Sequence, residues 1–195
     1  MPLLLNPVRT YPKVVGVAFL LLLAVVGSIT VNGFFPIAMV NGHWITSRQL
    51  DRMTQIAERY YEALSVTYED FPLEQIPSGE KLQAEVLLSM IEEYLIKEGV
   101  KEKVGTELES RVVSGLKKEL QNEELLTAGQ TLYELDKEDF IRYILTPRVE
   151  ADILGQQLAL SSQNLDDWIE QEKKAATVRI FSPYYAWDGV EVRSK

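Results

Sequence analysis

The chain contains no cysteine and a single histidine, His43. The absence of cysteine excludes a disulfide framework, a thiolate zinc site and a cysteine nucleophile. One histidine also excludes a histidine-dependent catalytic triad anywhere except around His43, which we expect to be a solvent-facing or lightly packed hairpin residue. The motifs H-E-x-x-H, G-x-S-x-G and G-x-G-x-x-G and a Walker-type loop are missing as well. We therefore expect no enzyme activity, no cofactor and no metal site.

Acidic residues are missing from the first 42 positions, where Arg9 and Lys13 are the only charged side chains. All 29 aspartates and glutamates follow, against 20 lysines and arginines in the whole chain, and the net charge is −9. Nucleic acid is therefore a poor partner, because phosphate binding depends on lysine and arginine. The uneven distribution of charge indicates that the chain has two parts, and that these parts lie in different solvents.

Residues 14–31 read VVGVAFLLLLAVVGSITV, a run without any charge. At about 1.5 Å per residue this run spans roughly 27 Å as a helix, close to the roughly 30 Å hydrocarbon core of a bilayer. We predict a membrane anchor at residues 14–36 after a short cytoplasmic segment at residues 1–13. Because Arg9 and Lys13 precede the run, the positive-inside rule places residues 37–195 outside the cytoplasm, in the periplasm or at the cell surface.

Two other interpretations of this run remain open. A cleaved signal peptide has an apolar core of about 7 to 15 residues and an A-x-A-like site, whereas this run is longer and offers only poorer sites such as Ser28-x-Thr30. A helix in a soluble core would need a partner on every face, which the charged remainder cannot readily supply. The uncleaved anchor in a single-pass protein of the cytoplasmic membrane is the interpretation that we favour.

Capping and turn signals divide the rest of the chain. Asn41-Gly42 between two apolar runs predicts a tight hairpin, because both residues accept positive φ. Thr46 and Gln49 have the spacing of a capping box and predict a helix that ends near Val66. Further helices are predicted to begin at the capping residues Ser78, Thr106, Asp136 and Asn164.

Glycine and proline mark the expected breaks. Gly99 and Gly105 weaken the end of the second helix, Gly129 lies in the next loop, and Pro147 kinks or divides the following helix near Leu145. Residues 177–181 alternate as a short strand, which we expect to pair with residues 38–40, because an isolated strand leaves its backbone unpaired. The fold class is therefore mainly α, with a small β pairing of the two ends of domain 37–195.

Carboxylate and aromatic pairs are the remaining candidates for chemistry. Adjacent residues on a helix point about 100° apart, so pairs such as Glu92-Glu93 are expected to form solvated faces instead of a metal site. For the same reason Tyr60 and Tyr61 can hardly both face one narrow core stripe, and they are our candidate client-binding residues. Residues 184–187 are a second possible peptide surface, and the stripe around residues 90–95 is broader than a small body can bury.

The order of these elements resembles a known family. The segment IAMVNGHWITSRQLDRM after the apolar run resembles the opening of SurA/PrsA/PpiD-type extracytoplasmic chaperones, in which a strand, a turn and a helix lead into a helical domain. The segments VLLSMIEEYLIKEGVKEKVG and LDKEDFIRYILTPRVEADIL also resemble parts of that family, so the likeness covers roughly residues 37–181. The residues that match the opening pattern are Ala38, Val40, Asn41, Gly42, Ile45, Thr46 and Leu50.

The resemblance implies a helical SurA-like chaperone module alone. Relatives often carry a parvulin prolyl-isomerase domain before the final helix and strand, but only SSQN stands between Leu160 and Leu165 here. It implies a membrane-anchored holdase without isomerase activity, which binds apolar segments of unfolded or newly exported polypeptides in a shallow helical groove. A structural adaptor that docks one dedicated partner in an envelope complex is the alternative, and the sequence does not separate the two.

Overall fold

The computed structural model describes residues 35–67 and 76–195. From Pro36 to Lys195 the chain forms one compact unit. The predicted cytoplasmic segment and all but the last two residues of the predicted anchor lie outside the described residues. Within the described ranges, no helix has both the length and the apolar character that a membrane crossing requires.

The unit begins with the hairpin that the sequence predicts. Strand β1 (Pro36–Val40) pairs antiparallel with β2 (His43–Thr46), and Val40 stands opposite His43. The two turn residues, Asn41 and Gly42, have φ values of 47° and 90°. A two-residue turn with positive φ at both positions matches the twist of the flanking strands. The Asn41-Gly42 prediction is confirmed.

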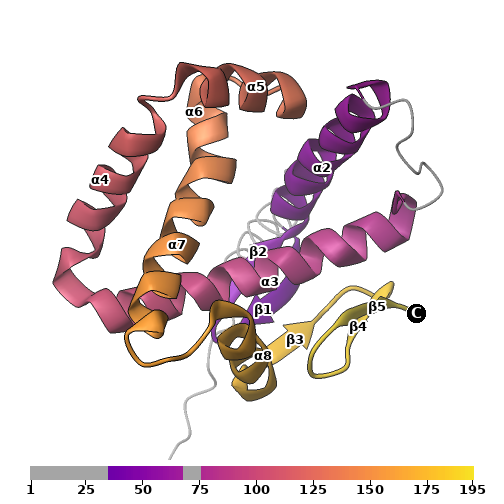
Figure 1. The fold of residues 1–195 in the computed structure, drawn as a ribbon. Coiled ribbons are helices and arrows are strands. Elements are labelled where there is room, and N and C mark those ends of the chain that lie inside the picture. The colour runs from indigo at the N-terminus through magenta and orange to yellow at the C-terminus, as the bar shows by residue number, and fades with distance from the viewer. Residues whose placement is uncertain (1–34, 68–75) are drawn as a thin grey trace, which may run out of the picture. The chain divides into compact units, whose positions relative to one another are not determined.

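The last predicted strand meets the first one, as expected. Strand β3 (Val178–Ile180) pairs antiparallel with β1, so that β1 lies at the centre of a sheet with the order β2-β1-β3. Beside this pairing, the N–H of Asn41 donates to the carbonyl of Thr177 at 3.0 Å, and the N–H of Thr177 donates to Oδ1 of Asn41 at 2.9 Å. One turn residue therefore bonds to the residue that precedes β3, and Figure 1 shows β3 next to β1.

Helices make up most of the described chain, which confirms the mainly α class. In Figure 1, α3 runs across the domain, with α4 and α7 rising from one end of it and α2 on the other side. A 3₁₀ turn, η2 (Gly105–Glu107), joins α3 to α4. The helices are α2 (Ser47–Thr67), α3 (Gly79–Val104), α4 (Leu108–Glu119), α5 (Glu123–Tyr133), α6 (Lys137–Phe140), α7 (Thr146–Ala159) and α8 (Leu165–Ala175).

Three of the predicted capping residues bind their helix as expected. Thr46 donates its N–H to Oε1 of Gln49 at 2.8 Å, and the N–H of Gln49 donates back to Oγ1 of Thr46 at 3.3 Å. The side chains of Asp136 and Asn164 accept from the N–H groups three residues later, at 2.8 and 2.7 Å. These bonds satisfy backbone donors that a helix start leaves free.

Two predicted caps differ from the structure. Ser78 stands at the N-cap of α3, but its side chain makes no capping bond. Thr106 does not cap α4, because it lies inside the 3₁₀ turn η2, which enters α4 with backbone that is already helical at Glu107. The turn begins at Gly105, whose φ of 60° ends α3. A continuous helical entry leaves no extended residue to act as a cap.

The prediction at Gly129 was wrong. Gly129 does not lie in a loop; it is buried inside α5, and a Cβ there would overlap the ring of Phe140. Helix α3 continues past Gly99 and ends at Gly105, and a Cβ at Gly99 would overlap the indole of Trp168 on α8. At both positions glycine allows a close approach of an aromatic ring and does not break the helix.

The predicted disturbance before Pro147 takes the form of a π-helical segment, η3 (Ile141–Leu145). The N–H of Thr146 donates to the carbonyl of Ile141, five residues earlier, and the Thr146 hydroxyl donates to the same carbonyl at 2.8 Å. This wider turn accommodates a proline that has no N–H to continue the α pattern. Segments α6, η3 and α7 therefore follow one another as one helical column (Figure 1).

Within residues 35–67 and 76–195, the core consists of three clusters. The first lies between the sheet, α2, α3 and the end of the chain, the second among α3, α4, α7 and α8, and the third among α2, α5, α6 and η3. The buried members of the first are Ala38, Val40, Ile45, Leu50, Leu82, Ala84, Val86, Leu87, Met90, Ile91, Leu95, Tyr185 and Val192. Those of the second are Val100, Val149, Ile153, Leu154, Leu158 and Trp168, and those of the third are Ile56, Leu126, Leu135, Phe140 and Leu145.

A second hairpin follows β3, and the sequence analysis missed it. Strand β4 (Tyr185–Trp187) pairs antiparallel with β5 (Val192–Ser194) around Asp188 and Gly189. Tyr185 is buried in the first core cluster and Trp187 packs against it, so residues 184–187 do not form an open peptide surface. Only Tyr184 is well exposed, at 60%. Asp-Gly is a strong hairpin signal, and it is the one that would have located this turn.

Candidate functional site

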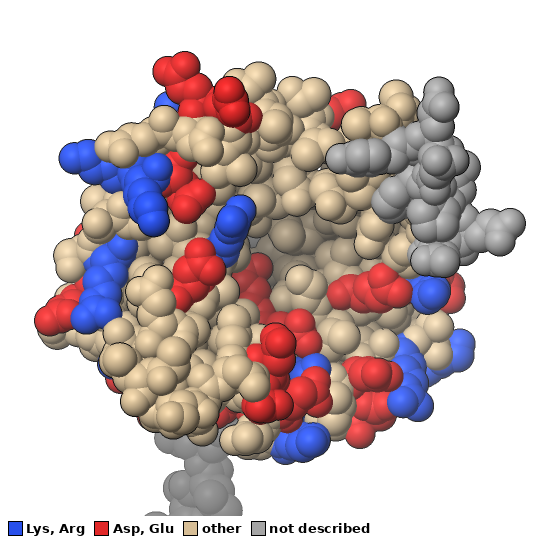
Figure 2. Space-filling view, viewed as in Figure 1, with Lys and Arg blue, Asp and Glu red and all other residues tan. Residues whose placement is uncertain are grey.

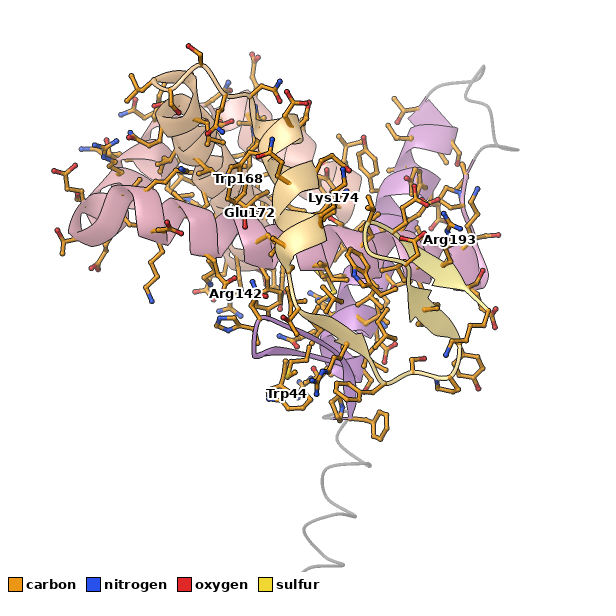
Figure 3. All side chains as sticks on the ribbon, turned by 90° about the horizontal axis from the view of Figure 1, so that it is seen from below. Trp44, Arg142, Trp168, Glu172, Lys174 and Arg193 are labelled. Carbon is orange, nitrogen blue, oxygen red and sulfur yellow. The ribbon has the colours of Figure 1, made fainter. Side chains whose placement is uncertain are left out.

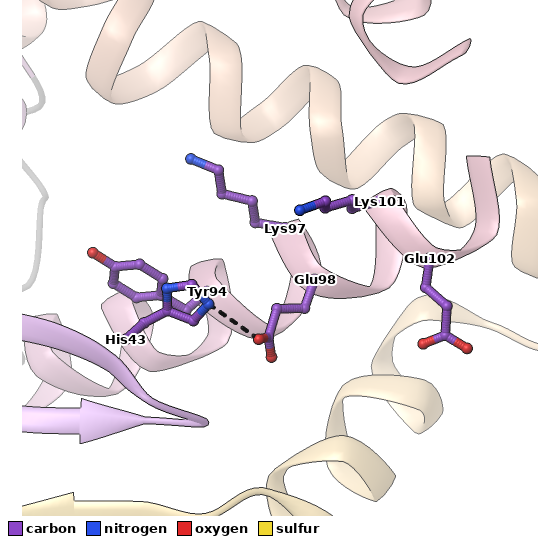
Figure 4. A pocket seen from close by; sticks show the side chains of 6 residues that line it. All are labelled: His43, Tyr94, Lys97, Glu98, Lys101 and Glu102. Carbon is purple, nitrogen blue, oxygen red and sulfur yellow. Dashed lines mark ion pairs between the residues drawn. The ribbon is translucent and has the colours of Figure 1, made fainter. Parts of the chain in front are cut away.

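A pocket of about 530 Å³ lies beside α3 where the first hairpin approaches it (Figure 4). One side chain of the hairpin and five of α3 form its lining. The five helical residues recur at spacings of three and four, which brings them to one side of the helix. The lining residues are His43, Tyr94, Lys97, Glu98, Lys101 and Glu102.

Charges of opposite sign occupy different parts of this lining. Lys97 and Lys101 are four residues apart, as are Glu98 and Glu102, so each pair lies along one row of the helix. In Figure 4 the two lysines extend to one side of α3 and the two glutamates to the other. The pocket therefore has a cationic and an anionic side, with the ring of Tyr94 at one end.

His43 is held against α3 by two contacts. Its imidazole stacks on Tyr94 with ring centroids 5.7 Å apart, and its Nε2 lies 3.2 Å from Oε1 of Glu98. The other oxygen of Glu98 accepts a 2.8 Å hydrogen bond from the side-chain amide of Asn41. His43 is a solvent-facing hairpin residue, as predicted, with 55% of its side chain exposed. The contacts with Tyr94 and Glu98 also fasten the hairpin to α3.

A second pocket, of about 160 Å³, adjoins the first, because Tyr94 lines both. Met53 on α2 and Met90 on α3 contribute apolar side chains; Met53 is partly exposed, whereas Met90 is 6% exposed and belongs to the first core cluster. We call the two pockets together the Tyr94 groove. The lining of the second pocket is Arg48, Gln49, Arg52, Met53, Met90, Glu93, Tyr94 and Tyr143.

The π-helical segment positions one wall of the Tyr94 groove. Tyr143 lies in η3, and the guanidinium carbon of Arg52 is 5.7 Å from the centroid of its ring. Arg52 also pairs with Asp139 of α6, with Nη2 and Oδ2 2.5 Å apart. These contacts join α2 to the column of α6 and η3. The arginine is thus fixed at the rim, where a cation over an aromatic face is favourable.

Glu93 is a partly buried carboxyl at this groove. Burial raises its pKa above the usual value of 4.5, and the negative charge of Glu150 raises it further, while Lys97 acts in the opposite direction. Burial likewise raises the pKa of Glu150. The prediction of a solvated face at Glu92-Glu93 was therefore wrong, because Glu93 turns inward and Glu92 pairs with the buried Lys173 at 3.0 Å.

The shifted carboxyl predicts a pH dependence. A raised pKa in the folded state means that folding binds protons, so stability falls as pH rises from about 4.5 through the folded pKa of Glu93. We expect Glu93→Gln to raise the melting temperature at pH 7 and to have little effect near pH 4. Thermal unfolding across this range measures the difference. The matched control is Glu102→Gln on the exposed part of α3, and an equal rise in both variants would contradict the assignment.

Tyr60 and Tyr61 face different parts of the domain, as their spacing predicts. Tyr60 stacks on Tyr133 of α5 with centroids 4.9 Å apart and meets Tyr61 edge-on at 5.7 Å. Tyr61 packs against the first core cluster. Both side chains are half-buried, and neither belongs to the lining of the Tyr94 groove. Their role in client binding stays a prediction.

The surface around α2, α3 and α7 is hollowed. Figure 2 shows the hollow at the centre of this face, with uncharged side chains over much of its wall and acidic side chains gathered below it.

Sequence reasoning missed Tyr94 as a groove residue. It placed Tyr94 in a stripe broader than the body can bury, but Met90, Ile91 and Leu95 of that stripe are buried in the first core cluster. Only Tyr94 stays partly exposed. No local signal separates it from its neighbours, because its exposure depends on where the hairpin docks.

Comparisons of the chain with protein-family models, with curated proteins and with solved structures find no match. Among residues 35–67 and 76–195, no group of three or more histidine, aspartate or glutamate side chains is placed to hold a metal ion. The geometry of the Tyr94 groove is therefore the main structural basis for a functional proposal.

Proposed function

We propose that this protein is a membrane-anchored, extracytoplasmic holdase of the SurA-like class, without isomerase activity, that binds apolar segments of exported polypeptides. The observation that carries the proposal is the Tyr94 groove, in which an aromatic ring and two methionines lie between charged rims. The hairpin of β1 and β2 that leads into α2 supports it, since the family resemblance covers the same strand, turn and helix.

The composition of the Tyr94 groove suits a site that binds many different partners better than a site that binds a single partner. Methionine side chains repack around different shapes, and surfaces of this kind bind promiscuously. Lysines at the rim can bind backbone carbonyls and anionic side chains, and glutamates can bind backbone N–H groups and cationic side chains. A groove of this kind holds an unfolded segment weakly and needs no nucleotide to release it.

The test is suppression of aggregation by the full chain in lipid nanodiscs. A chemically unfolded model protein is diluted into buffer with loaded or empty nanodiscs, and light scattering is followed. We expect the loaded nanodiscs to slow aggregation, and Tyr94→Ser to weaken binding about fivefold or more, the loss typical of an aromatic contact residue. The matched control is Tyr184→Ser at an exposed tyrosine outside the groove. Equal suppression by both variants would contradict the role of the groove.

Crosslinking in cells separates a holdase from an adaptor. A photoreactive phenylalanine analogue is placed at Tyr94, at Tyr60 or at Tyr61, with Val66 as the exposed control position. The aromatic replacement keeps a ring at each tyrosine, so the stacking contacts are retained. Capture of many unrelated exported proteins from Tyr94 is the expected result. Capture of one abundant protein would favour the adaptor with a dedicated partner.

A further inference from the structure

The sheet has an outer face that carries two exposed aromatic side chains. Ala38 and Val40 of β1 are fully buried toward the first core cluster, so Met39 between them points to the opposite face. Trp44 on β2 stands opposite Met39 and is 53% exposed. Phe181, which follows β3, is 42% exposed.

The two rings form a stack on this face. Trp44 and Phe181 have ring centroids 5.5 Å apart with an interplanar angle of 27°. The N–H of Phe181 donates to the carbonyl of Ile37 at 2.8 Å, which fixes the second ring beside the first residues of β1. Figure 3 shows Trp44 at the outer edge of the domain, pointing away from the helices. Such a pair is costly in water and indicates a surface that is covered.

The number of residues between the uncharged run and β1 limits how far this aromatic pair can lie from that run. Strand β1 begins at Pro36, and only residues 32–35 separate it from the uncharged run 14–31. Four residues span at most about 14 Å in any conformation. If the run crosses a bilayer, the start of β1 lies within about 14 Å of the hydrocarbon core, which places it in the headgroup layer of about 5 to 7 Å or just outside that layer.

We infer that the Trp44–Phe181 stack inserts into the headgroup layer of the bilayer and fixes the orientation of the domain on the membrane. Tryptophan and other amphipathic rings favour this layer. Arg179 stands opposite Met39 on the other side of β1 and is exposed, so a cation lies on the same face toward anionic lipid. The inference rests on the membrane anchor of the proposed function.

The absence of cysteine makes a direct test possible. The full chain carries a nitroxide either at Arg179→Cys, which leaves both rings in place, or at Phe181→Cys, which replaces one ring by the label, and is reconstituted into vesicles of phosphatidylethanolamine and phosphatidylglycerol. The control is Val66→Cys, an 81% exposed position near the far end of α2, roughly 28 Å along the helix from its start after β2. The measurement is the ratio of oxygen to nickel-complex accessibility at each label.

We expect this ratio to be several-fold higher at residues 179 and 181 than at residue 66, in protein that floats with the vesicles. If the protein floats with the vesicles but the accessibility ratio is equally low at all three positions, the inference is overturned and the anchor stands. Protein that does not float would overturn the anchor and the inference with it. Dipolar broadening between labels at residue 181 of two chains would show that a second copy covers this face, which also overturns the inference.

Discussion

Deletion of residues 177–195 is expected to abolish cooperative unfolding of the helical body. The deletion removes β3, the partner of β1, and the β4–β5 hairpin, which contributes Tyr185 and Val192 to the first core cluster. Burying one such side chain is worth about 1.5–3 kcal/mol, so the two together account for about 3–6 kcal/mol. This is a large share of a typical total of about 5–15 kcal/mol. Far-ultraviolet circular dichroism during heating measures the transition.

Two adjacent tyrosines provide a single-residue version of this test. Tyr185 is 3% exposed and donates its hydroxyl to Oε1 of Gln83 at 2.5 Å, whereas Tyr184 is 60% exposed. We expect Tyr185→Ala to cost about 3–5 kcal/mol, as for other buried aromatic residues, and Tyr184→Ala to cost under about 0.5 kcal/mol. Similar melting temperatures for the two variants, or an unchanged one after the deletion, would contradict the closure of the domain by its final residues.

Gly129→Ala is expected to destabilise the protein although alanine favours helices. The substitution gains up to about 1 kcal/mol of helix propensity in α5. Its Cβ, however, would overlap the ring of the buried Phe140, and overpacking of this kind costs about 1–3 kcal/mol. The matched control is Gly155→Ala in α7, where a Cβ meets no atom within 4 Å and a gain of about 0.5–1 kcal/mol is expected. Urea denaturation measures both changes.

A double variant isolates the contact with Phe140. Adding Phe140→Leu to Gly129→Ala removes the overlapping ring, so the two substitutions together should cost less than the sum of their separate effects. Strict additivity would show that the glycine is needed for another reason. Gly99→Ala should behave in the same way through Trp168.

Local signals predicted the elements that depend on neighbouring residues. The turn at Asn41-Gly42 and the cap formed by Thr46 and Gln49 are confirmed because each is determined within four residues. Gly129 was misassigned because its meaning depends on Phe140, which belongs to another helix. In the sequence, a glycine that breaks a helix cannot be distinguished from a glycine that leaves room for an aromatic ring.

The candidate site was less predictable than the fold. That His43 belongs to a hairpin could be predicted. Its stack on Tyr94, however, requires the hairpin to dock on α3, which lies far along the sequence. The different directions of Tyr60 and Tyr61 could be predicted from helix geometry, yet no pattern shows that Tyr133 of α5 covers one face of the Tyr60 ring. Pairings of this kind depend on how helices pack and not on the periodicity of any one of them.

The two bonds between Asn41 and Thr177 bear on the order in which the protein is made. The residues are 136 positions apart, so β1 leaves the ribosome long before its partner exists. Until then one edge of β1 has free N–H and C=O groups, which are a template for a strand of another chain. A chain halted before residue 177 keeps this open edge permanently. Two nascent chains that already contain β3 could exchange this strand, which would satisfy the open β1 edge of each chain. Of the strands in the described residues, β1 is synthesised first, and its pairing is completed only when β3 has been made.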